Sequence, residues 1–183
     1  MNLDDNAAGH GVAVVIGASG AIGKALCDGL ESDGAYASVL RLSRSGQPSI
    51  DLHSEPSITA AAAFASERGD IRLVINAAGF LHDDRFTPER SWRDIDPEAM
   101  RKAFAINAIG PALVMKRFLP LLPRQGRAVV AILSAKVGSI GDNRLGGWHA
   151  YRASKAALNQ IVRTAAVELK RVRPQAICVA PHP

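Results

Sequence analysis

Cysteine is scarce in this sequence of 183 residues, and long apolar runs are missing from it. Its two cysteines, Cys27 and Cys178, lie far apart, which argues against a disulfide framework and a zinc site and favours buried thiols. No apolar run reaches the roughly 18 residues needed to cross a bilayer. Residues 1–10 open acidic and lack an apolar core, unlike a secretory signal or a basic transit peptide. We therefore expect a soluble cytoplasmic protein with no membrane partner and no bound metal.

Charge of one sign is also not concentrated anywhere. The chain has 22 lysines and arginines against 17 acidic residues, which gives a formal net charge of +5, and the basic residues are scattered among the acidic ones. A nucleic-acid binder usually gathers its basic residues on one patch or helix, so we expect no nucleic-acid partner. Hydrophobic residues make up 48 % and charged residues 21 %, which is typical of a folded globular chain and excludes disorder.

Short apolar strands alternate with helical stretches along the chain. The β-branched run at 12–16, closed by Gly17, is typical of a strand buried on both faces of a parallel sheet. The same pattern predicts strands at 37–42, 71–75, 127–133 and 175–180, and helices at 21–31, 56–67, 97–119 and 150–171. This alternation predicts an α/β fold: a doubly wound parallel sheet of the Rossmann type in three layers, with 1–183 as a single domain.

A glycine-rich loop joins the first predicted strand to the first predicted helix. Glycines let the backbone turn sharply and approach a pyrophosphate, whose charge suits the free N–H groups of a helix start. Such a loop alone is weak evidence, but the flanking strand and helix supply the required context. The sequence therefore predicts a dinucleotide site formed by Gly17, Ser19, Gly20, Ala21, Ile22 and Gly23.

The end of the second strand bears on which dinucleotide is bound. An NAD site usually has an acidic residue there for the ribose hydroxyl, whereas an NADP site has a cation for the 2′-phosphate. Residues 41–45 contain no acid; Arg44 can donate in a fork to a phosphate, and Ser43 and Ser45 can donate to it as well. The alternative is an arginine exposed in a turn. The pattern favours NADP(H).

A tyrosine and a lysine share one face of the last predicted helix. Tyr151 and Lys155 are four residues apart, and the same face continues through Leu158 and Val162. A phenol with a pKa near 10 becomes a useful proton donor or acceptor when a neighbouring cation stabilises its anion. The alternative is that Lys155 only extends its ammonium to water at a helix end.

These motifs together resemble the short-chain dehydrogenase/reductase family, in the branch near C-factor-like proteins and carbonyl reductases. The glycine loop, Asn76-Ala77-Ala78-Gly79, Asn107 and Tyr151-x-x-x-Lys155 recur in this order in that family, and the resemblance covers nearly all of residues 12–183. It implies an oxidoreductase that uses NADP(H). It also implies a C-terminal segment, missing from these residues, that would cover the substrate and determine its identity.

The resemblance also implies roles for individual residues. Tyr151 would be the acid/base, and Lys155 would hold the nicotinamide ribose and lower the tyrosine pKa. Asn107 would anchor a water in a proton relay to Lys155. The adenosine side would be lined by Asn76, Ala77, Ala78 and Gly79, and the adenine would meet Asp51 and Leu52.

Asn107 has a physical argument of its own. Pro111, four residues later, has no N–H to donate to the Asn107 carbonyl, and Gly110 loosens the same turn. A carbonyl left free in this way could hold a water in a polar site. The alternative is a proline kink whose water lies on the outside of the protein.

The serine of the family pattern is displaced in this chain. The expected position, three residues before Gly138, is occupied by Ala135, and Ser134 lies one residue earlier. A shift of one residue in a strand turns a side chain to the opposite face. Either the strand end is distorted so that Ser134 points inward, which we favour, or Ser139 takes its place. His149 is expected at the rim of the substrate pocket. Ala21, where the family pattern has a glycine, is a smaller departure.

The sequence therefore predicts an NADP(H)-dependent oxidoreductase that acts on a small-molecule carbonyl or secondary alcohol. The rival interpretation is a non-catalytic NADP-binding or signalling protein with a degenerate site, which the displaced serine favours. We also expect a homodimer or homotetramer, because small side chains allow close packing of helices. The outer face of the tyrosine helix carries Ala153, Ala156, Ala157 and Thr164.

Overall fold

A computed structural model describes residues 11–182 and contains the predicted parallel sheet. All its strand pairs are parallel, in the order β2-β1-β3-β4-β5. Its strands are β1 (Val12–Ile16), β2 (Ser38–Leu42), β3 (Ile71–Asn76), β4 (Ala128–Ile132) and β5 (Ala176–Val179). The strand order reverses at β1, where the chain leaves for β2 on one side and returns as β3 on the other. Ligands of such sheets bind at the carboxyl ends beside this reversal.

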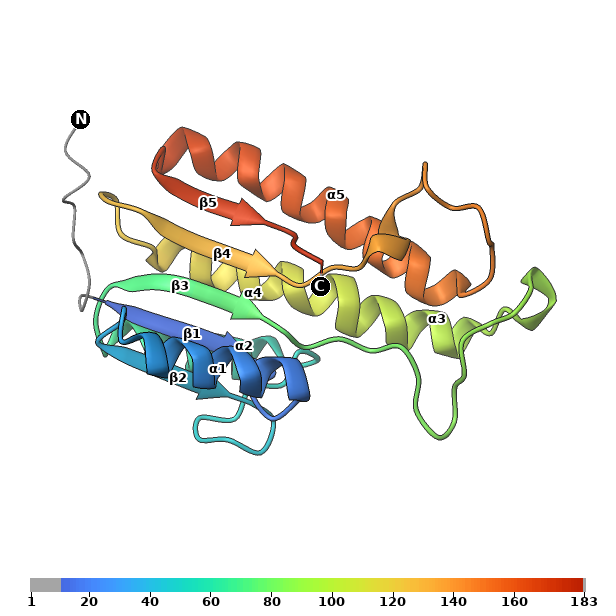
Figure 1. The fold of residues 1–183 in the computed structure, drawn as a ribbon, viewed down its shortest axis with the longest axis horizontal. Coiled ribbons are helices and arrows are strands. Elements are labelled where there is room, and N and C mark those ends of the chain that lie inside the picture. The colour runs from blue at the N-terminus through green and yellow to red at the C-terminus, as the bar shows by residue number, and fades with distance from the viewer. Residues whose placement is uncertain (1–10, 183) are drawn as a thin grey trace.

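Helices cover both faces of the sheet, which confirms the three-layer arrangement (Figure 1). The helix α1 (Ala21–Asp33) packs on β1 and β2 from one side, where Cys27 meets Ala13 and Val15. The other side is covered by α2 (Glu55–Ser66), α4 (Gly110–Phe118) and α5 (His149–Val172). The larger core lies on this side, because Ile58, Phe118 and Leu158 from these helices are fully buried against the strands.

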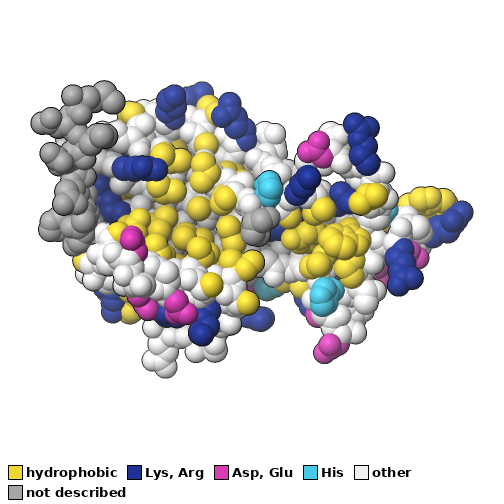
Figure 2. Space-filling model, viewed as in Figure 1, with side chains coloured by type: hydrophobic (Ala, Val, Ile, Leu, Met, Phe, Trp, Pro, Cys, Tyr) yellow, Lys and Arg dark blue, Asp and Glu magenta, His cyan; other side chains and the backbone are white. Residues whose placement is uncertain are grey.

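On the α1 side, β4 and β5 remain partly uncovered. Val129 and Ala131 of β4 are only partly buried, and Ile177 and Val179 of β5 are exposed. Figure 2 shows apolar side chains gathered over this part of the sheet. The layer opposite α4 and α5 is therefore incomplete within the described residues.

The predicted helix at 97–119 is interrupted, which corrects the prediction of one continuous helix. It consists of α3 (Pro97–Phe104), a π-helical turn η2 (Ala105–Ile109), α4 and a short 3-10 turn η3 (Leu119–Leu121). In the π-helical turn the Gly110 N–H donates to the Ala105 carbonyl, five residues back. Pro111 explains the interruption, since it cannot donate to Asn107 and its ring would crowd that carbonyl.

The same segment is long and apolar enough to be compared with a membrane-spanning helix. By length and composition alone, Pro97–Leu121 is a candidate span, although it carries charged residues near both ends. In the structure α4 lies between α2 and α5, and Val114 and Phe118 are fully buried in the core. Packing inside the helical layer accounts for the apolar residues of this segment.

Candidate functional site

A cleft of about 500 Å³ opens at the carboxyl ends of β1, β2 and β3. It is the place expected for a ligand of this sheet topology. Most of the predicted cofactor residues line it: Gly17, Ser19, Gly20, Ser43, Arg44, Asp51, Leu52, Ala77, Ala78 and Gly79.

The other residues predicted to bind the cofactor do not line the cleft. They are Ala21, Ile22, Gly23, Ser45, Asn76, Tyr151 and Lys155. Asn76 is fully buried, and its side-chain oxygen accepts a hydrogen bond from the Ala78 N–H at 3.0 Å. Gly23 is buried in the first turns of α1. Asn76 and Gly23 are packed inside the protein, so they support the loops of the cleft without lining it.

The glycine loop is packed so tightly that it leaves no room for a side chain at Gly17 or Gly23. Gly17 has φ +85°, and a Cβ on it would lie 2.7 Å from the Ala78 nitrogen. A Cβ on Gly23 would lie 2.2 Å from the Gly17 carbonyl oxygen. The backbone of the loop is therefore accessible from the cleft beside the start of α1, where free N–H groups attract anions. This geometry fits the pyrophosphate of a dinucleotide.

The structure brings Tyr151 and Lys155 together on the inner face of α5, as predicted. Lys155 is 3 % exposed, and its ammonium donates a hydrogen bond to the Leu133 carbonyl at 2.8 Å. The Lys155 nitrogen lies 5.9 Å from the centroid of the Tyr151 ring. A Cβ on Gly79 would lie 3.8 Å from the same nitrogen. The pair therefore lies next to the end of the cleft.

Burial changes the pKa of both members of the pair, and for Tyr151 in the direction opposite to the expected one. Desolvation lowers the pKa of Lys155 to about 8. Desolvation also raises the pKa of the Tyr151 phenol, although the resemblance implied that Lys155 would lower it. The physical reason is that removing water disfavours the phenolate, while the ammonium is directed to the Leu133 carbonyl.

Asn107 is fully buried in the π-helical turn, and its side chain binds the loop that follows β3. Its oxygen accepts from the Phe80 N–H at 2.8 Å, and its nitrogen donates to the Phe80 carbonyl at 2.8 Å. The same nitrogen donates to the Ser154 hydroxyl on α5 at 3.0 Å. Asn107 therefore joins the end of the cleft to the helix of Tyr151 and Lys155.

The hydroxyls of both candidate serines have partners other than Tyr151. Ser134 is 7 % exposed and donates to the side-chain oxygen of Asn159 on α5 at 2.6 Å. Ser139 follows the short helix η4 (Lys136–Gly138), and its oxygen accepts from the Asp142 N–H at 3.4 Å. Ser134 thus contacts the helix that carries the tyrosine and lysine, whereas Ser139 lies in the loop.

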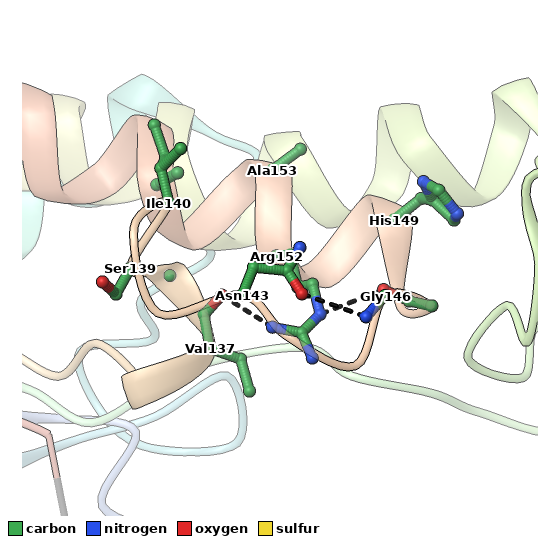
Figure 3. Close-up of a pocket in the computed structure, with 11 residues that line it drawn as sticks. Val137, Ser139, Ile140, Asn143, Gly146, His149, Arg152 and Ala153 are labelled. Carbon is green, nitrogen blue, oxygen red and sulfur yellow. Dashed lines mark hydrogen bonds between the residues drawn. The ribbon is translucent and has the colours of Figure 1, made fainter.

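A smaller pocket of about 240 Å³ lies between this loop and α5 (Figure 3). His149 lines this pocket and not the cleft at the strand ends. In Figure 3 the Arg152 side chain extends from α5 to the loop, and its Nε donates to the Gly147 carbonyl at 3.0 Å. Within residues 11–182, no cluster of three or more His, Cys, Asp or Glu is placed to hold a metal.

Sequence reasoning missed several residues at the mouth of the cleft, namely Phe80, His82, Asp83 and Lys102. Lys102 on α3 forms an ion pair with Asp83, and its ammonium lies 4.8 Å from the centroid of the Phe80 ring. Nothing in the sequence pattern could reveal this pair, since its members are 19 residues apart on different elements.

Comparison with known proteins is consistent with this geometry. The short chain dehydrogenase family profile matches residues 11–183. Over 116 residues the chain is 36 % identical to 1-hydroxy-2-glutathionyl-2-methyl-3-butene dehydrogenase of a Rhodococcus species, covering 63 % of this chain and 48 % of that protein. Over 77 residues it is 42 % identical to C-signal of Myxococcus xanthus, covering 42 % and 46 %. The matches thus span about half the length of these curated relatives.

Solved structures give the same result for the fold. The putative carbonyl reductase Sniffer of Caenorhabditis elegans superposes with a TM-score of 0.83 at 25 % identity, covering 96 % of this chain and 85 % of that one. NADPH-bound carbonyl reductase from chicken fatty liver superposes with a TM-score of 0.80 at 25 % identity, covering 95 % and 76 %. The profile match extends over all the described residues. The glycine loop lines the cleft, and Asn107 and Lys155 lie beside Gly79 at its end. The chain belongs to the short chain dehydrogenase family.

Proposed function

We propose that this protein binds NADP(H) in the cleft and transfers a hydride between the nicotinamide and a carbonyl or secondary alcohol. The observation that carries the choice of cofactor is a contrast between two arginines at the end of β2. Arg41 is held by Asp28 and Glu31, both at 2.6 Å. Arg44 is exposed, lines the cleft, and has no ion pair within residues 11–182. A guanidinium in that position can donate two parallel hydrogen bonds to a phosphate.

Tyr151 is proposed as the residue that exchanges a proton with the substrate oxygen. Because burial raises its pKa, the phenol is protonated at neutral pH and suited to donate to a carbonyl oxygen. Lys155, with a pKa of about 8, is mostly cationic at neutral pH and stabilises the phenolate that remains after the transfer. NADP(H), when bound, supplies the hydride chemistry. A protonated Tyr151 beside a cationic Lys155 therefore suits reduction near neutral pH.

Asn107, Ser154 and Ser134 are proposed to support this pair. Asn107 fixes the backbone of Phe80 at the end of the cleft and donates to Ser154, whose hydroxyl donates to the Tyr151 carbonyl at 2.9 Å. Ser134 fixes α5 through Asn159. We also propose that Asn107 anchors a water molecule in a proton relay to Lys155.

Two measurements test the function. Isothermal titration of the protein with NADPH and with NADH should give the tighter binding for NADPH. Mixing the protein with NADPH and a panel of aldehydes and ketones should then consume NADPH, as followed by its absorbance. Binding without turnover on the whole panel would refute the enzymatic assignment.

A second candidate is a nucleotide-binding signalling protein without turnover. The hydroxyl of Ser134 is engaged by Asn159, and Ala135 occupies the serine position of the family pattern. The partial match to C-signal is consistent with this interpretation. The turnover panel separates the two candidates.

We further propose that the protein acts as a homodimer or homotetramer. A groove of about 460 Å³ runs along the outer side of α4 and α5, lined by apolar and small side chains that include Ala112, Leu119, Ile161 and Ala165. Small side chains allow close helix packing between copies. Light scattering at micromolar concentration measures the mass, and a monomer would refute this proposal.

A further inference from the structure

The helix that carries Tyr151 and Lys155 begins without a cap of its own. Its N-cap residue is Trp148, whose side chain makes no capping hydrogen bond and whose backbone has φ +53°. The first N–H groups of a helix have no partners within the helix, and a tryptophan cannot supply one. A positive φ is also unusual for a bulky residue. Another part of the chain must therefore hold this helix start in place.

Glu89 supplies the missing acceptors. It lies in the loop between β3 and α3, and among the described residues it is the only buried aspartate or glutamate, at 6 % exposed. Its carboxylate oxygen Oε1 accepts from the Ala150 N–H at 3.1 Å, and its main-chain carbonyl accepts from the Trp148 N–H at 2.6 Å. A carboxylate at a helix start is also favoured by the helix dipole. One residue thus binds the helix on both sides of His149.

The surrounding contacts leave this turn little freedom. A Cβ on Gly147, which has φ +65°, would lie 3.1 Å from the Glu89 carbonyl oxygen. The Arg152 Nε donates a hydrogen bond to the Gly147 carbonyl at 3.0 Å. The segment from Gly147 to Ala150 is therefore fixed between Glu89 and Arg152.

This segment adjoins Tyr151 both in the chain and in space. Tyr151 follows Ala150 directly, and the Trp148 ring meets the Tyr151 ring edge-on, with centroids 6.2 Å apart. We propose that Glu89 is a positioning residue for Tyr151: its carboxylate and carbonyl anchor the start of α5 and so fix the phenol beside Lys155 and the cleft. This inference rests on the proposed function of Tyr151.

The test compares three substitutions in the same loop. Glu89→Ala removes the side-chain acceptor, Glu89→Gln keeps an oxygen of the same reach, and Asp84→Ala removes an exposed carboxylate as the matched control. We expect kcat for carbonyl reduction to fall roughly 10- to 100-fold in Glu89→Ala, because small misplacements of reacting groups have effects of this size. The Kd for NADPH should stay within about twofold, since Glu89 does not line the cleft. Glu89→Gln should recover most of kcat, and Asp84→Ala should match the wild type.

A second readout needs no turnover. Trp92 is replaced by Phe, which leaves Trp148 as the only tryptophan and as a fluorescent reporter beside Tyr151. Acrylamide quenching of Trp148 should increase in Glu89→Ala and return toward the wild-type value in Glu89→Gln. Both readouts are taken well below the melting temperature of each variant.

The outcomes separate this inference from the proposed function. Unchanged kcat in Glu89→Ala, or a loss that Glu89→Gln fails to recover, would overturn the positioning role. If the wild type itself shows no turnover, the proposed function fails, and the quenching of Trp148 alone decides whether Glu89 anchors the helix. Quenching that is unchanged in Glu89→Ala would then overturn the anchor.

Discussion

The side chain of Asn107 satisfies both main-chain polar groups of Phe80, accepting from its N–H and donating to its carbonyl, each at 2.8 Å. The two residues are 27 positions apart, on the π-helical turn and on the loop after β3. Through this contact and the bond to Ser154, one buried amide connects the end of the cleft to α5.

The first prediction tests that connection. Asn107→Leu should lower the free energy of unfolding by about 2–4 kcal/mol, because each unpaired buried polar group costs about 1–3 kcal/mol. Urea denaturation measures the change. Asn143→Ala, which changes an exposed asparagine of the loop before α5, is the control and should have little effect. A loss below about 1 kcal/mol in Asn107→Leu would show that Phe80 finds other partners.

The second prediction concerns Tyr151. Tyr151→Phe keeps the ring but removes the phenol, so NADPH binding should stay nearly intact while reduction falls by at least ~10²-fold, the usual scale of positioned proton transfer. Tyr36→Phe is the matched control, because Tyr36 packs beside the α1 core. Turnover above about a tenth of the wild-type rate in Tyr151→Phe would rule out its role as the acid.

The third prediction concerns cofactor choice. NADPH should bind roughly 10- to 100-fold more tightly than NADH, since a hydrogen bond to a charged group contributes about 1.5–3 kcal/mol. Arg44→Ala should remove most of this gap by weakening NADPH alone, and added salt should narrow it because Arg44 is exposed. In Arg41→Ala, where the arginine lost is paired with Asp28 and Glu31, the ratio should persist. Equal affinities in the wild type would refute the assignment.

The fourth prediction follows from the buried ammonium of Lys155. Its pKa in the folded protein, about 8, lies below the ordinary value of 10.5. Burial of the charge therefore reduces the free energy of unfolding, and the whole of this reduction is present below about pH 8. This loss disappears as the pH rises from about 8 to 10.5, where the unfolded chain binds the extra proton. Stability of the wild type relative to Lys155→Met should therefore rise by about 3 kcal/mol over that range.

Denaturant unfolding at about pH 7.5 and about pH 10.5 measures the difference for both proteins. Lys136→Met replaces an exposed lysine and serves as the control, with no change in relative stability expected. A constant difference between wild type and Lys155→Met would mean that the hydrogen bond to Leu133 compensates the burial of the charge.

The fifth prediction compares two glycines of α1. A Cβ on Gly23 would lie 2.2 Å from the Gly17 carbonyl, so Gly23→Ala should lower the free energy of unfolding by about 1–3 kcal/mol and weaken cofactor binding. Gly29 has open space around it, so Gly29→Ala should stabilise the protein by about 0.5–1 kcal/mol through helix propensity. Thermal unfolding measures both. Equal effects of the two substitutions would show that the loop relaxes to accept a methyl group on Gly23 without strain.

Features that depend on near neighbours could be predicted from the sequence. Strand and helix positions follow from local periodicity, and the structure places them within a few residues of the prediction, with β1 at the predicted bounds. Tyr151 and Lys155 share a helix face because four residues make about one turn. The glycine loop lies between β1 and α1 because parallel strands require such a connection.

Features that depend on contacts between distant segments could not be predicted in this way. The pKa of Tyr151 depends on how far the packed elements bury its phenol, and this burial raises the pKa. The hydrogen-bond partner of Ser134 is Asn159, 25 residues away on α5, and the two meet only when this helix packs against the sheet. Glu89 shows no helical or strand pattern, and its role at the start of α5 exists only because the loop folds across a gap of 61 residues to Ala150. Local sequence fixes dihedral preferences, whereas desolvation and hydrogen bonding between elements arise only when the elements pack together.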